Sequence, residues 1–167
     1  ELLQSPSQRL FNMGLFTARE VATGPDRDVS LASEVDLALV KTAGGSGPLR
    51  GDRAALVIDL LADRNAGGAG KAVQQALAEA TTAGDPVVKL SAVRALGRCG
   101  DAAAADRLLD LAVASDEPVV AAVRQAVAGM SADGVDERIV ARLDAKSAAL
   151  PLVVGLVGDR RIVSASG

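Results

Sequence analysis

Proline recurs along this chain at intervals that predict a repeated structural unit. The six prolines are at positions 6, 25, 48, 86, 118 and 151, and all but Pro25 stand just before an apolar run. Proline is accepted in the first turn of a helix because the backbone N–H groups there have no partner within the helix. The other five prolines are separated by 42, 38, 32 and 33 residues. Spacing in this range is typical of units made of two helices.

Two sequence matches support the repetition. Residues 85–88, Asp-Pro-Val-Val, recur 32 positions later as Glu-Pro-Val-Val at 117–120. Residues 60–64, Leu-Leu-Ala-Asp-Arg, resemble Leu-Val-Gly-Asp-Arg at 156–160, an offset of 96 residues, which is three times 32. A two-helix unit cannot bury its own apolar side, so we expect each unit to stack on the next.

Helix signals agree with one another inside one such unit. Asp85 is a favourable N-cap, and apolar residues at positions 88, 92, 95 and 99 lie on one helical face. Gly100 stands where a helix commonly ends in a left-handed conformation, and Asp101 is a good cap for the helix that follows. These signals predict helices over 86–98 and 102–114.

The same signals predict an all-α chain that forms a single domain over 1–167. The expected helix pairs are 6–22 with 31–42, 48–64 with 69–82, 86–98 with 102–114, 118–130 with 136–144, and 150–158 with a truncated helix that starts near Ile162. Residues 1–3 resemble the end of an earlier helix. We also expect the chain to be a fragment of a longer protein, because it begins without Met and ends soon after a helix start.

Composition supports helices over strands. Apolar residues make up 49% of the chain and aromatic residues 1%, with Phe11 and Phe16 the only rings. The core must therefore be built from Ala, Leu and Val, which suit close packing of helices, whereas strands favour aromatic and β-branched residues.

The chain lacks the residues that most enzymes need. It has no histidine, the usual general base near neutral pH and the commonest metal ligand, and Cys99 is its only cysteine. Ser-His and Cys-His nucleophile pairs, an internal disulfide and a cysteine-based zinc site are thus excluded. We predict no enzymatic activity, no catalytic residue, no cofactor and no metal site.

Charge and hydropathy exclude two further classes of partner. The net charge is −3 and the two signs are interspersed, so no basic stripe is present to bind nucleic acid. Stacking platforms for bases are also lacking, since both rings lie in one N-terminal segment. No apolar run approaches the ~18 residues of a membrane span. We expect neither nucleic-acid binding nor a transmembrane segment.

Residues 85–101 read Asp-Pro-Val-Val-Lys-Leu-Ser-Ala-Val-Arg-Ala-Leu-Gly-Arg-Cys-Gly-Asp. This segment resembles the bacterial HEAT-like repeat of the kind grouped with phycobiliprotein lyases, whose pattern runs from Asp-x-x-Val-Arg through Ala-Leu-Gly to Gly-Asp. Lys89 stands where the family usually has Arg, and Ala121 occupies that place in the next unit. The resemblance is strong over about 47–161. It implies a right-handed α-solenoid, or α-α superhelix, of about four to five HEAT-like helix pairs.

The resemblance also implies a function. Such solenoids bind along a concave face lined by the second helix of each pair, so the residues to suspect are exposed and polar on those helices. The candidate partner-binding residues are Lys71, Gln74, Gln75, Asp106, Arg107, Asp110, Arg138 and Arg142. We expect a non-catalytic interaction or spacer module whose partner is another protein or an adjoining domain. Bacterial proteins of this type are commonly exported.

Two other functions stay open. The segment could be the accessory repeat region of a lyase-like, hydrolase or cytochrome-containing enzyme whose catalytic domain lies elsewhere. It could also bind a carbohydrate or a cofactor such as a tetrapyrrole.

Three features have both a structural and a functional interpretation. Cys99 lies on an apolar face and is expected to be a buried small hydrophobe, the alternative being a reactive thiol. Phe11 and Phe16 are expected in the core, the alternative being a contact for another domain. The Asp-Arg pairs at 63–64 and 159–160 are expected to form local ion pairs at solvated helix ends, the alternative being an anion-binding corner.

Overall fold

The computed structural model describes residues 2–23, 29–43, 49–65, 70–144 and 149–162. Within these ranges the chain is helical and has no strand, which confirms the predicted all-α class. In the described residues a short 3-10 helix, Leu2–Gln4, precedes nine α-helices. They are α1 (Gln8–Thr23), α2 (Val29–Ala43), α3 (Gly51–Arg64), α4 (Lys71–Ala80), α5 (Pro86–Cys99), α6 (Ala102–Val113), α7 (Glu117–Gly129), α8 (Val135–Asp144) and α9 (Leu150–Arg160).

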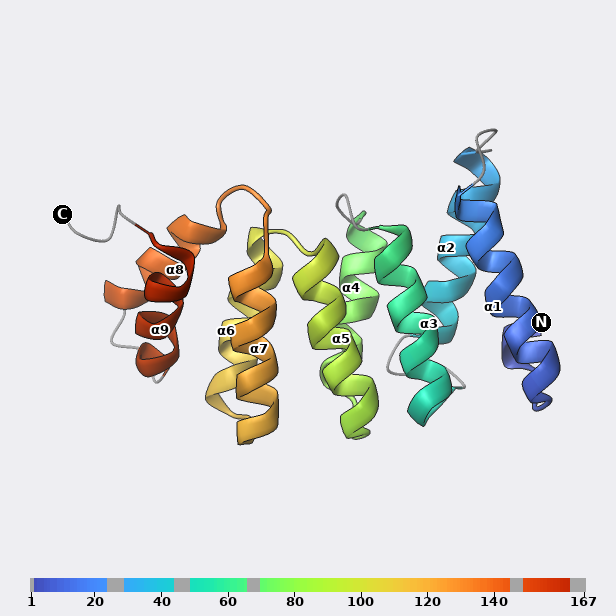
Figure 1. The fold of residues 1–167 in the computed structure, drawn as a ribbon, viewed down its shortest axis with the longest axis horizontal. Coiled ribbons are helices and arrows are strands. Elements are labelled where there is room, and N and C mark those ends of the chain that lie inside the picture. The colour runs from blue at the N-terminus through green and yellow to red at the C-terminus, as the bar shows by residue number, and fades with distance from the viewer. Residues whose placement is uncertain (1, 24–28, 44–48, 66–69, 145–148, 163–167) are drawn as a thin grey trace.

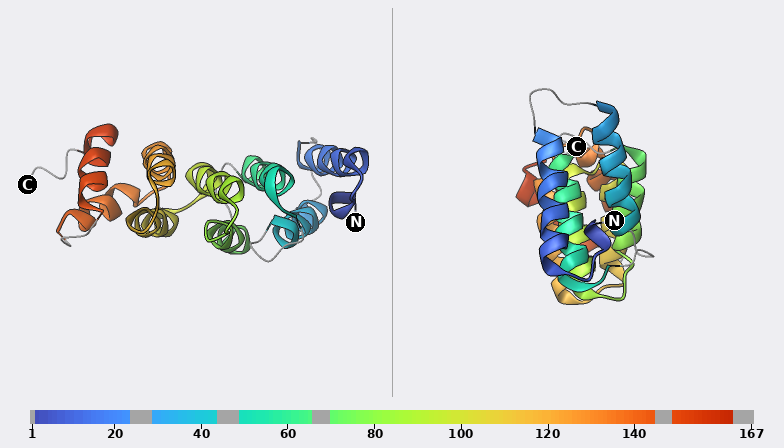
Figure 2. Two further views of the ribbon diagram at one scale, coloured as in Figure 1. Left: turned by 90° about the horizontal axis from the view of Figure 1, so that it is seen from below. Right: turned by 90° about the vertical axis from the view of Figure 1, so that its right-hand side faces the viewer.

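The helices form two layers that run side by side along the molecule (Figures 1 and 2). In the odd-numbered layer, α3 packs between α1 and α5, and α7 packs between α5 and α9. In the even-numbered layer, α2 contacts α4, α4 contacts α6, and α6 contacts α8. Each helix from α1 to α7 therefore meets the helix two places ahead of it. The N-terminal and C-terminal ends of the chain lie at opposite ends of this row (Figure 1).

Aspartates at the predicted N-cap positions hold the helix starts. The carboxylate of Asp85 accepts a hydrogen bond from the N–H of Val87 at 2.9 Å, in the first turn of α5, and another from the N–H of Gly51 at 2.8 Å, at the start of α3. The hydrogen bond from Gly51 is the largest cause that lowers the pKa of Asp85. Asp101 accepts from the N–H of Ala104 at 2.9 Å and caps α6. Both predicted caps are confirmed, and Asp85 in addition ties two helices together.

Three prolines lie in the first turn of a helix, as the sequence predicts. Pro86 opens α5, and Pro118 and Pro151 are the second residues of α7 and α9. Pro6 instead precedes α1, which begins two residues later, at Gln8.

Other predicted helix bounds differ from the observed ones by one to three residues. Helix α3 begins at Gly51 and not at position 48, which lies outside the described residues. Helix α4 is shorter than the predicted 69–82, and α9 continues past the predicted position 158. At the N-terminal end, Leu2–Gln4 forms a 3-10 helix that packs on α1. The truncated helix predicted after Ile162 falls outside the described residues.

The core is made of small aliphatic side chains and extends along the whole row. Every α-helix contributes buried apolar residues to it, from Phe11 in α1 to Leu156 in α9. Phe11 is fully buried, and most of the other buried side chains are Ala, Leu or Val. This agrees with the composition. It also means that each inner pair of helices is covered by its neighbours on both sides.

At two positions, one in α5 and one at its end, only glycine fits, because a Cβ atom would lie too close to a neighbouring atom. A Cβ atom on Gly97 of α5 would lie 2.8 Å from both the Cα and the Cβ atoms of Ala126 in α7, so these helices approach each other very closely here. The prediction of a left-handed Gly100 is wrong, because its φ of −78° and ψ of 160° are extended. A Cβ atom at Gly100 would lie 2.4 Å from the carbonyl oxygen of Leu96.

None of the described helices combines the length and the apolar character that a membrane span requires.

The close approach at Gly97 leads to a first prediction. Gly97→Ala forces α5 away from α7 and should lower the free energy of unfolding by about 1–3 kcal/mol, measured by urea denaturation. Gly158→Ala in α9 is the matched control, because a Cβ atom there has no neighbour within 4 Å. That control should be stabilising by up to about 1 kcal/mol through helix propensity alone. Equal effects of the two substitutions would show that the α5–α7 contact is not close.

Candidate functional site

Four of the eight predicted binding residues line one open groove between α4 and α6. They are Lys71, Gln74, Gln75 and Arg107, and the groove has a volume of about 660 Å³. Its remaining walls are formed by Ala78, Glu79, Thr82, Asp101 and Ala103. Because α4 and α6 are consecutive helices of the even-numbered layer, the groove crosses the boundary between two helix pairs. We call it the α4–α6 groove.

The α4–α6 groove carries two cations that form no ion pair with any described residue, Lys71 and Arg107. Its two carboxylates are already engaged, since Asp101 caps α6 and Glu79 accepts a hydrogen bond from the side-chain amide of Gln75 at 3.1 Å. Lys71 and Arg107 are thus charged hydrogen-bond donors in the groove that could bind acceptor groups of a ligand. Carboxylates make the strongest hydrogen bonds with such donors.

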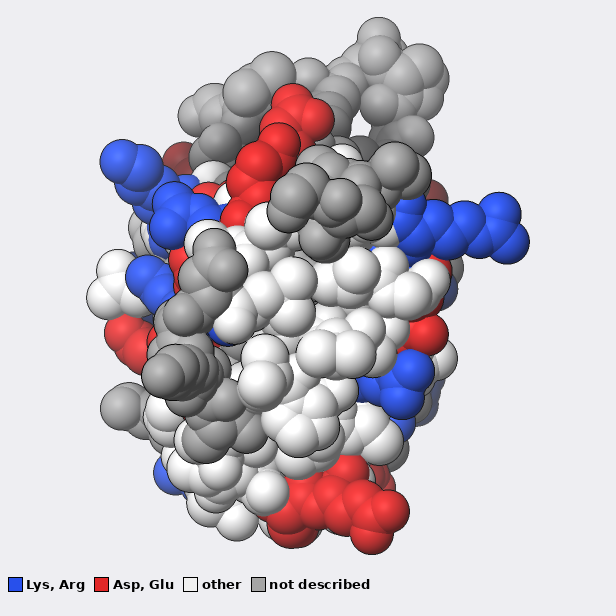
Figure 3. All heavy atoms as spheres, turned by 90° about the vertical axis from the view of Figure 1, so that its left-hand side faces the viewer, with Lys and Arg blue, Asp and Glu red and all other residues white. Residues whose placement is uncertain are grey.

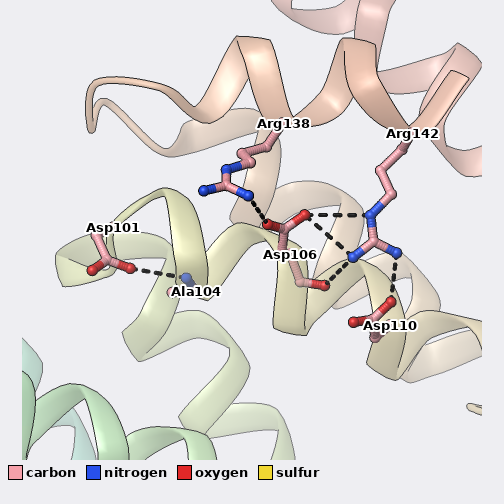
Figure 4. A network of polar contacts seen from close by, with 6 residues as sticks. All are labelled: Asp101, Ala104, Asp106, Asp110, Arg138 and Arg142. Carbon is pink, nitrogen blue, oxygen red and sulfur yellow. Dashed lines mark hydrogen bonds and ion pairs between the residues drawn. The ribbon is translucent and has the colours of Figure 1, made fainter. Parts of the chain in front are cut away.

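The other four predicted residues form an ion-pair network that joins α6 to α8 (Figure 4). Arg142 donates to Asp110 at 2.5 Å and to Asp106 at 3.2 Å, while Arg138 binds the second carboxylate oxygen of Asp106 at 3.1 Å. The hydrogen bond to Asp110 is the main cause that raises the pKa of Arg142. These side chains face one another across two helices, so their interactions connect neighbouring pairs.

The Asp-Arg pairs repeated in the sequence place their arginines in equivalent roles. Arg64 ends α3 and donates to Asp36 of α2 at 2.5 Å and to the carbonyl oxygen of Ala18 in α1 at 2.6 Å. Arg160 ends α9 and donates to Asp136 of α8 at 2.5 Å and to backbone carbonyl oxygens at the end of α7. Their side chains are 2% and 13% exposed. The prediction of local ion pairs at solvated helix ends is therefore wrong for both arginines, because each pairs with a carboxylate of an earlier helix and lies largely out of solvent. Neither is available to bind an anion.

The odd-numbered layer has a second groove that sequence reasoning missed. It crosses α3, α5 and α7 and has a volume of about 730 Å³. At its edge Arg98 of α5 bridges Asp59 and Asp63 of α3, at 2.9 and 2.6 Å. Burial is the largest cause that raises the pKa of Asp59, and Arg98 opposes it. The signal was present as two acids four residues apart on one helix and Arg94 with Arg98 on the next, but the family resemblance favoured the other layer.

The prediction that both phenylalanines pack in the core is wrong for Phe16. Its exposed fraction is 65%, and it lies with Leu56 on a smaller groove of about 310 Å³ between α1 and α3. Phe11 is fully buried. Five residues of helix rotate a side chain by about 140° around the axis, so one apolar face cannot hold both rings.

The prediction that Cys99 is a buried hydrophobe is confirmed. Its exposed fraction is 2%, and its Sγ atom lies 3.2 Å from the carbonyl oxygen of Ala95. Burial raises the pKa of the Cys99 thiol to about 11. The thiolate, which is the reactive form, is therefore scarce at neutral pH.

In the described part of the chain no three His, Cys, Asp or Glu side chains are grouped so that they could hold a metal ion.

Comparisons of the chain with protein-family models, with curated proteins and with solved structures found no match. We therefore infer its function from the grooves and the ion pairs.

The burial of Arg64 leads to a second prediction. Arg64→Ala leaves the carboxylate of Asp36 and the carbonyl of Ala18 without their donor, and should lower the free energy of unfolding by about 2–4 kcal/mol. Arg64→Lys should recover only part of this loss, because an ammonium cannot reproduce the planar fork.

The control for Arg64 is Arg124→Ala. Arg124 pairs with Asp159 at 2.8 Å, but the two side chains are 52% and 37% exposed, so the substitution should change stability little. If Arg64→Ala is as mild as Arg124→Ala, the buried arginine does not hold the helix pairs together.

The pKa of Cys99 leads to a third prediction. Modification of the folded protein by iodoacetamide should be negligible at pH 8 and should become fast only when the chain is unfolded. The folded thiol keeps its proton up to a pH of about 11. The unfolded thiol ionises near pH 9, so the free energy of unfolding should fall as the pH rises from about 9 to about 11. A Cys99→Ala variant controls for other groups that titrate in this range.

Proposed function

We propose that this chain is a non-catalytic protein-binding module, built as a right-handed solenoid of HEAT-like helix pairs. The packing of each helix against the helix two places ahead supports the solenoid, as do the sequence echoes at 32 and 96 residues. The resemblance of residues 85–101 to the HEAT-like repeat supports the family. The binding site is the α4–α6 groove, and its occupant is an acidic segment of a partner protein.

This proposal rests on the lack of an ion pair at Lys71 and Arg107 among the described residues. The arginines that connect helices, such as Arg98 and Arg142, are each held by carboxylates of the protein. Lys71 and Arg107 come from two different helix pairs, line one groove and have no such carboxylate among the described residues. Two donors that are presented together without acceptors favour a ligand that supplies carboxylates.

The stiffness of the groove walls also favours binding. Both walls are helices whose inner faces are buried in the core, through residues such as Val73, Leu77 and Leu108. A surface that is formed before binding costs little ordering entropy, so a few contacts are sufficient for affinity.

The nucleophiles and bases of the chain support a non-catalytic role. The sequence has no histidine, and its one thiol is buried with a pKa raised to about 11. The carboxylates Asp106, Asp110 and Asp136 are each paired with an arginine. General acid–base catalysis needs a group whose pKa is tuned toward the working pH inside a pocket.

A fourth prediction tests this function. Selection of displayed random peptides on the immobilised chain should enrich peptides that contain Asp and Glu. The affinity of an enriched peptide, measured by fluorescence anisotropy, should fall at least about tenfold in Lys71→Ala/Arg107→Ala and should also fall with added salt.

The matched control removes two positive charges elsewhere, in Arg9→Ala/Arg94→Ala. Arg9 and Arg94 are exposed side chains of the odd-numbered layer, so this variant should bind the peptide as the wild type does. An equal loss in both double variants would contradict a specific groove. Binding of haem or an oligosaccharide, with no peptide enriched, would contradict the protein-binding function itself.

A further inference from the structure

The helices α4 and α6 occupy equivalent places in consecutive helix pairs. The buried residues of α4 are Val73, Ala76, Leu77 and Ala80. Their counterparts 32 positions later in α6 are also buried, and they are Ala105, Leu108, Leu109 and Ala112. The same offset separates the matching segments 85–88 and 117–120. Each residue of α4 therefore has a counterpart position in α6.

Helices α6 and α8 are related in the same way, with an offset of 31. Two buried residues of α6 have buried counterparts in α8, and these pairs are Ala104 with Val135 and Leu108 with Ile139. By this relation Arg107 of α6 corresponds to Arg138 of α8, and both arginines are exposed.

The contact between α6 and α8 shows which partner an arginine at this position has elsewhere in the row. Arg138 of α8 pairs with Asp106 of α6 at 3.1 Å (Figure 4). The counterpart of Asp106 in α4 is Gln74, and the counterpart of Arg138 in α6 is Arg107. Both Gln74 and Arg107 line the α4–α6 groove. The boundary between α4 and α6 therefore has the arginine of this contact without its carboxylate.

The second ion pair between α6 and α8 has no equivalent in the α4–α6 groove. Asp110 pairs with Arg142 at 2.5 Å, and the counterparts of these two residues are Ala78 and Leu111. Ala78 lines the groove, and its side chain is shorter than that of aspartate. The volume that a second carboxylate would fill is thus left open to a ligand.

Lys71 adds a cation that the corresponding wall of α6 does not have, since its counterpart there is Ala103. Lys71 and Arg107 are both exposed, and neither forms an ion pair with a described residue. The groove therefore presents two cations together with a neutral residue, Gln74, at the position where α6 has an acid.

Charged side chains lie mainly along the sides of the row. Figure 3 looks along the row from α8 and α9 and shows acidic and basic groups around the edges of a largely uncharged face. A ligand that is recognised through its charge is thus expected at the sides of the row, where the α4–α6 groove opens.

We infer that one carboxylate of the bound acidic segment takes the place that Asp106 has in the contact between α6 and α8. It lies beside Gln74 and accepts hydrogen bonds from Arg107 and Lys71. Gln74 determines specificity, because its neutral amide leaves Arg107 for the ligand, whereas an acid there would pair with Arg107 as Asp106 pairs with Arg138. The inference rests on the proposed function of the groove and names the ligand group that the groove recognises.

The substitution Gln74→Glu tests the inference without any ligand. It keeps the size of the side chain and supplies the carboxylate that α4 lacks. It should raise the urea midpoint of unfolding more in the wild type than in Arg107→Ala, where the new carboxylate has no arginine to bind. Effects of the new charge on α4 itself are the same in both backgrounds, so the difference between the two shifts measures the coupling of positions 74 and 107.

The same substitution should weaken binding. The affinity of an acidic peptide enriched by the selection, labelled with fluorescein and measured by anisotropy, should fall at least about tenfold in Gln74→Glu, because the new carboxylate occupies Arg107 and repels the ligand. Gln125→Glu is the matched control, since it makes the same chemical change at an exposed residue of α7 in the odd-numbered layer. This variant should bind the peptide as the wild type does.

Substitutions in the peptide identify the carboxylate. Each Asp or Glu of the peptide is replaced in turn by its amide. One replacement should weaken binding to the wild type at least about tenfold. The same replacement should have little effect on binding to Arg107→Ala, because the arginine that binds this carboxylate is already absent.

Failure of this inference can be told from failure of the proposed function. If acidic peptides bind and Lys71→Ala/Arg107→Ala weakens them, but Gln74→Glu binds as the wild type does, the binding groove stands and the place assigned to the carboxylate is wrong. Equal shifts of the urea midpoint in the two backgrounds, or an equal loss of affinity in Gln125→Glu, would also overturn the inference. If no acidic peptide binds the wild type, the proposed function fails and this inference fails with it.

Discussion

Contact between neighbouring helices with small side chains is the constraint on which the structure depends. The chain has almost no aromatic residues, so Ala, Leu and Val must exclude water, and they do so only where backbones come close. Gly97 against Ala126 is the clearest example. No helix has enough bulk to form a core alone, and each inner helix is covered by the helices before and after it in its layer. The core therefore takes the form of a row, which leaves an open surface on each layer and at each end.

Charged side chains connect the same neighbours. Four arginines each reach back to a carboxylate of an earlier helix. Arg98 and Arg142 do so within one layer, while Arg64 and Arg160 reach from the odd-numbered layer to the even-numbered one. Apolar packing between small side chains is tolerant of sliding, whereas an arginine with two fixed acceptors allows only one register. We interpret these arginines as the contacts that fix how neighbouring helices are aligned along the row. Lys71 and Arg107 stand apart from them, and this contrast makes the α4–α6 groove the best candidate for binding.

The sequence predicted the helices well because their signals are local. Asp85 and Asp101 cap the helices that they were predicted to cap, and Pro86 opens α5, since a cap or a first-turn proline acts within four residues. What depends on distant residues was predicted less well. Only glycine fits at position 100, because a Cβ atom would lie too close to the carbonyl oxygen of Leu96, and no turn rule reveals this. Phe16 was predicted to be buried because the apolar face of α1 was taken to be wider than it is, and its side chain is exposed.

The candidate site was predicted in part for the same reason. The sequence indicates which residues are polar on the even-numbered helices, and four of them do line one groove. It does not indicate which charges find partners on the next helix. Asp106, Asp110, Arg138 and Arg142 are paired only because α6 and α8 lie side by side, a relation that appears once the chain is folded.

The double role of Asp85 affects how the row opens. Its one carboxylate holds the first N–H of α3 and the first turn of α5 at the same time. If either helix frays, the carboxylate loses an anchor and the other helix start loses a rigid acceptor. The second and third helix pairs are thus coupled at their ends as well as along their sides, and local opening at this boundary is expected to involve both pairs together.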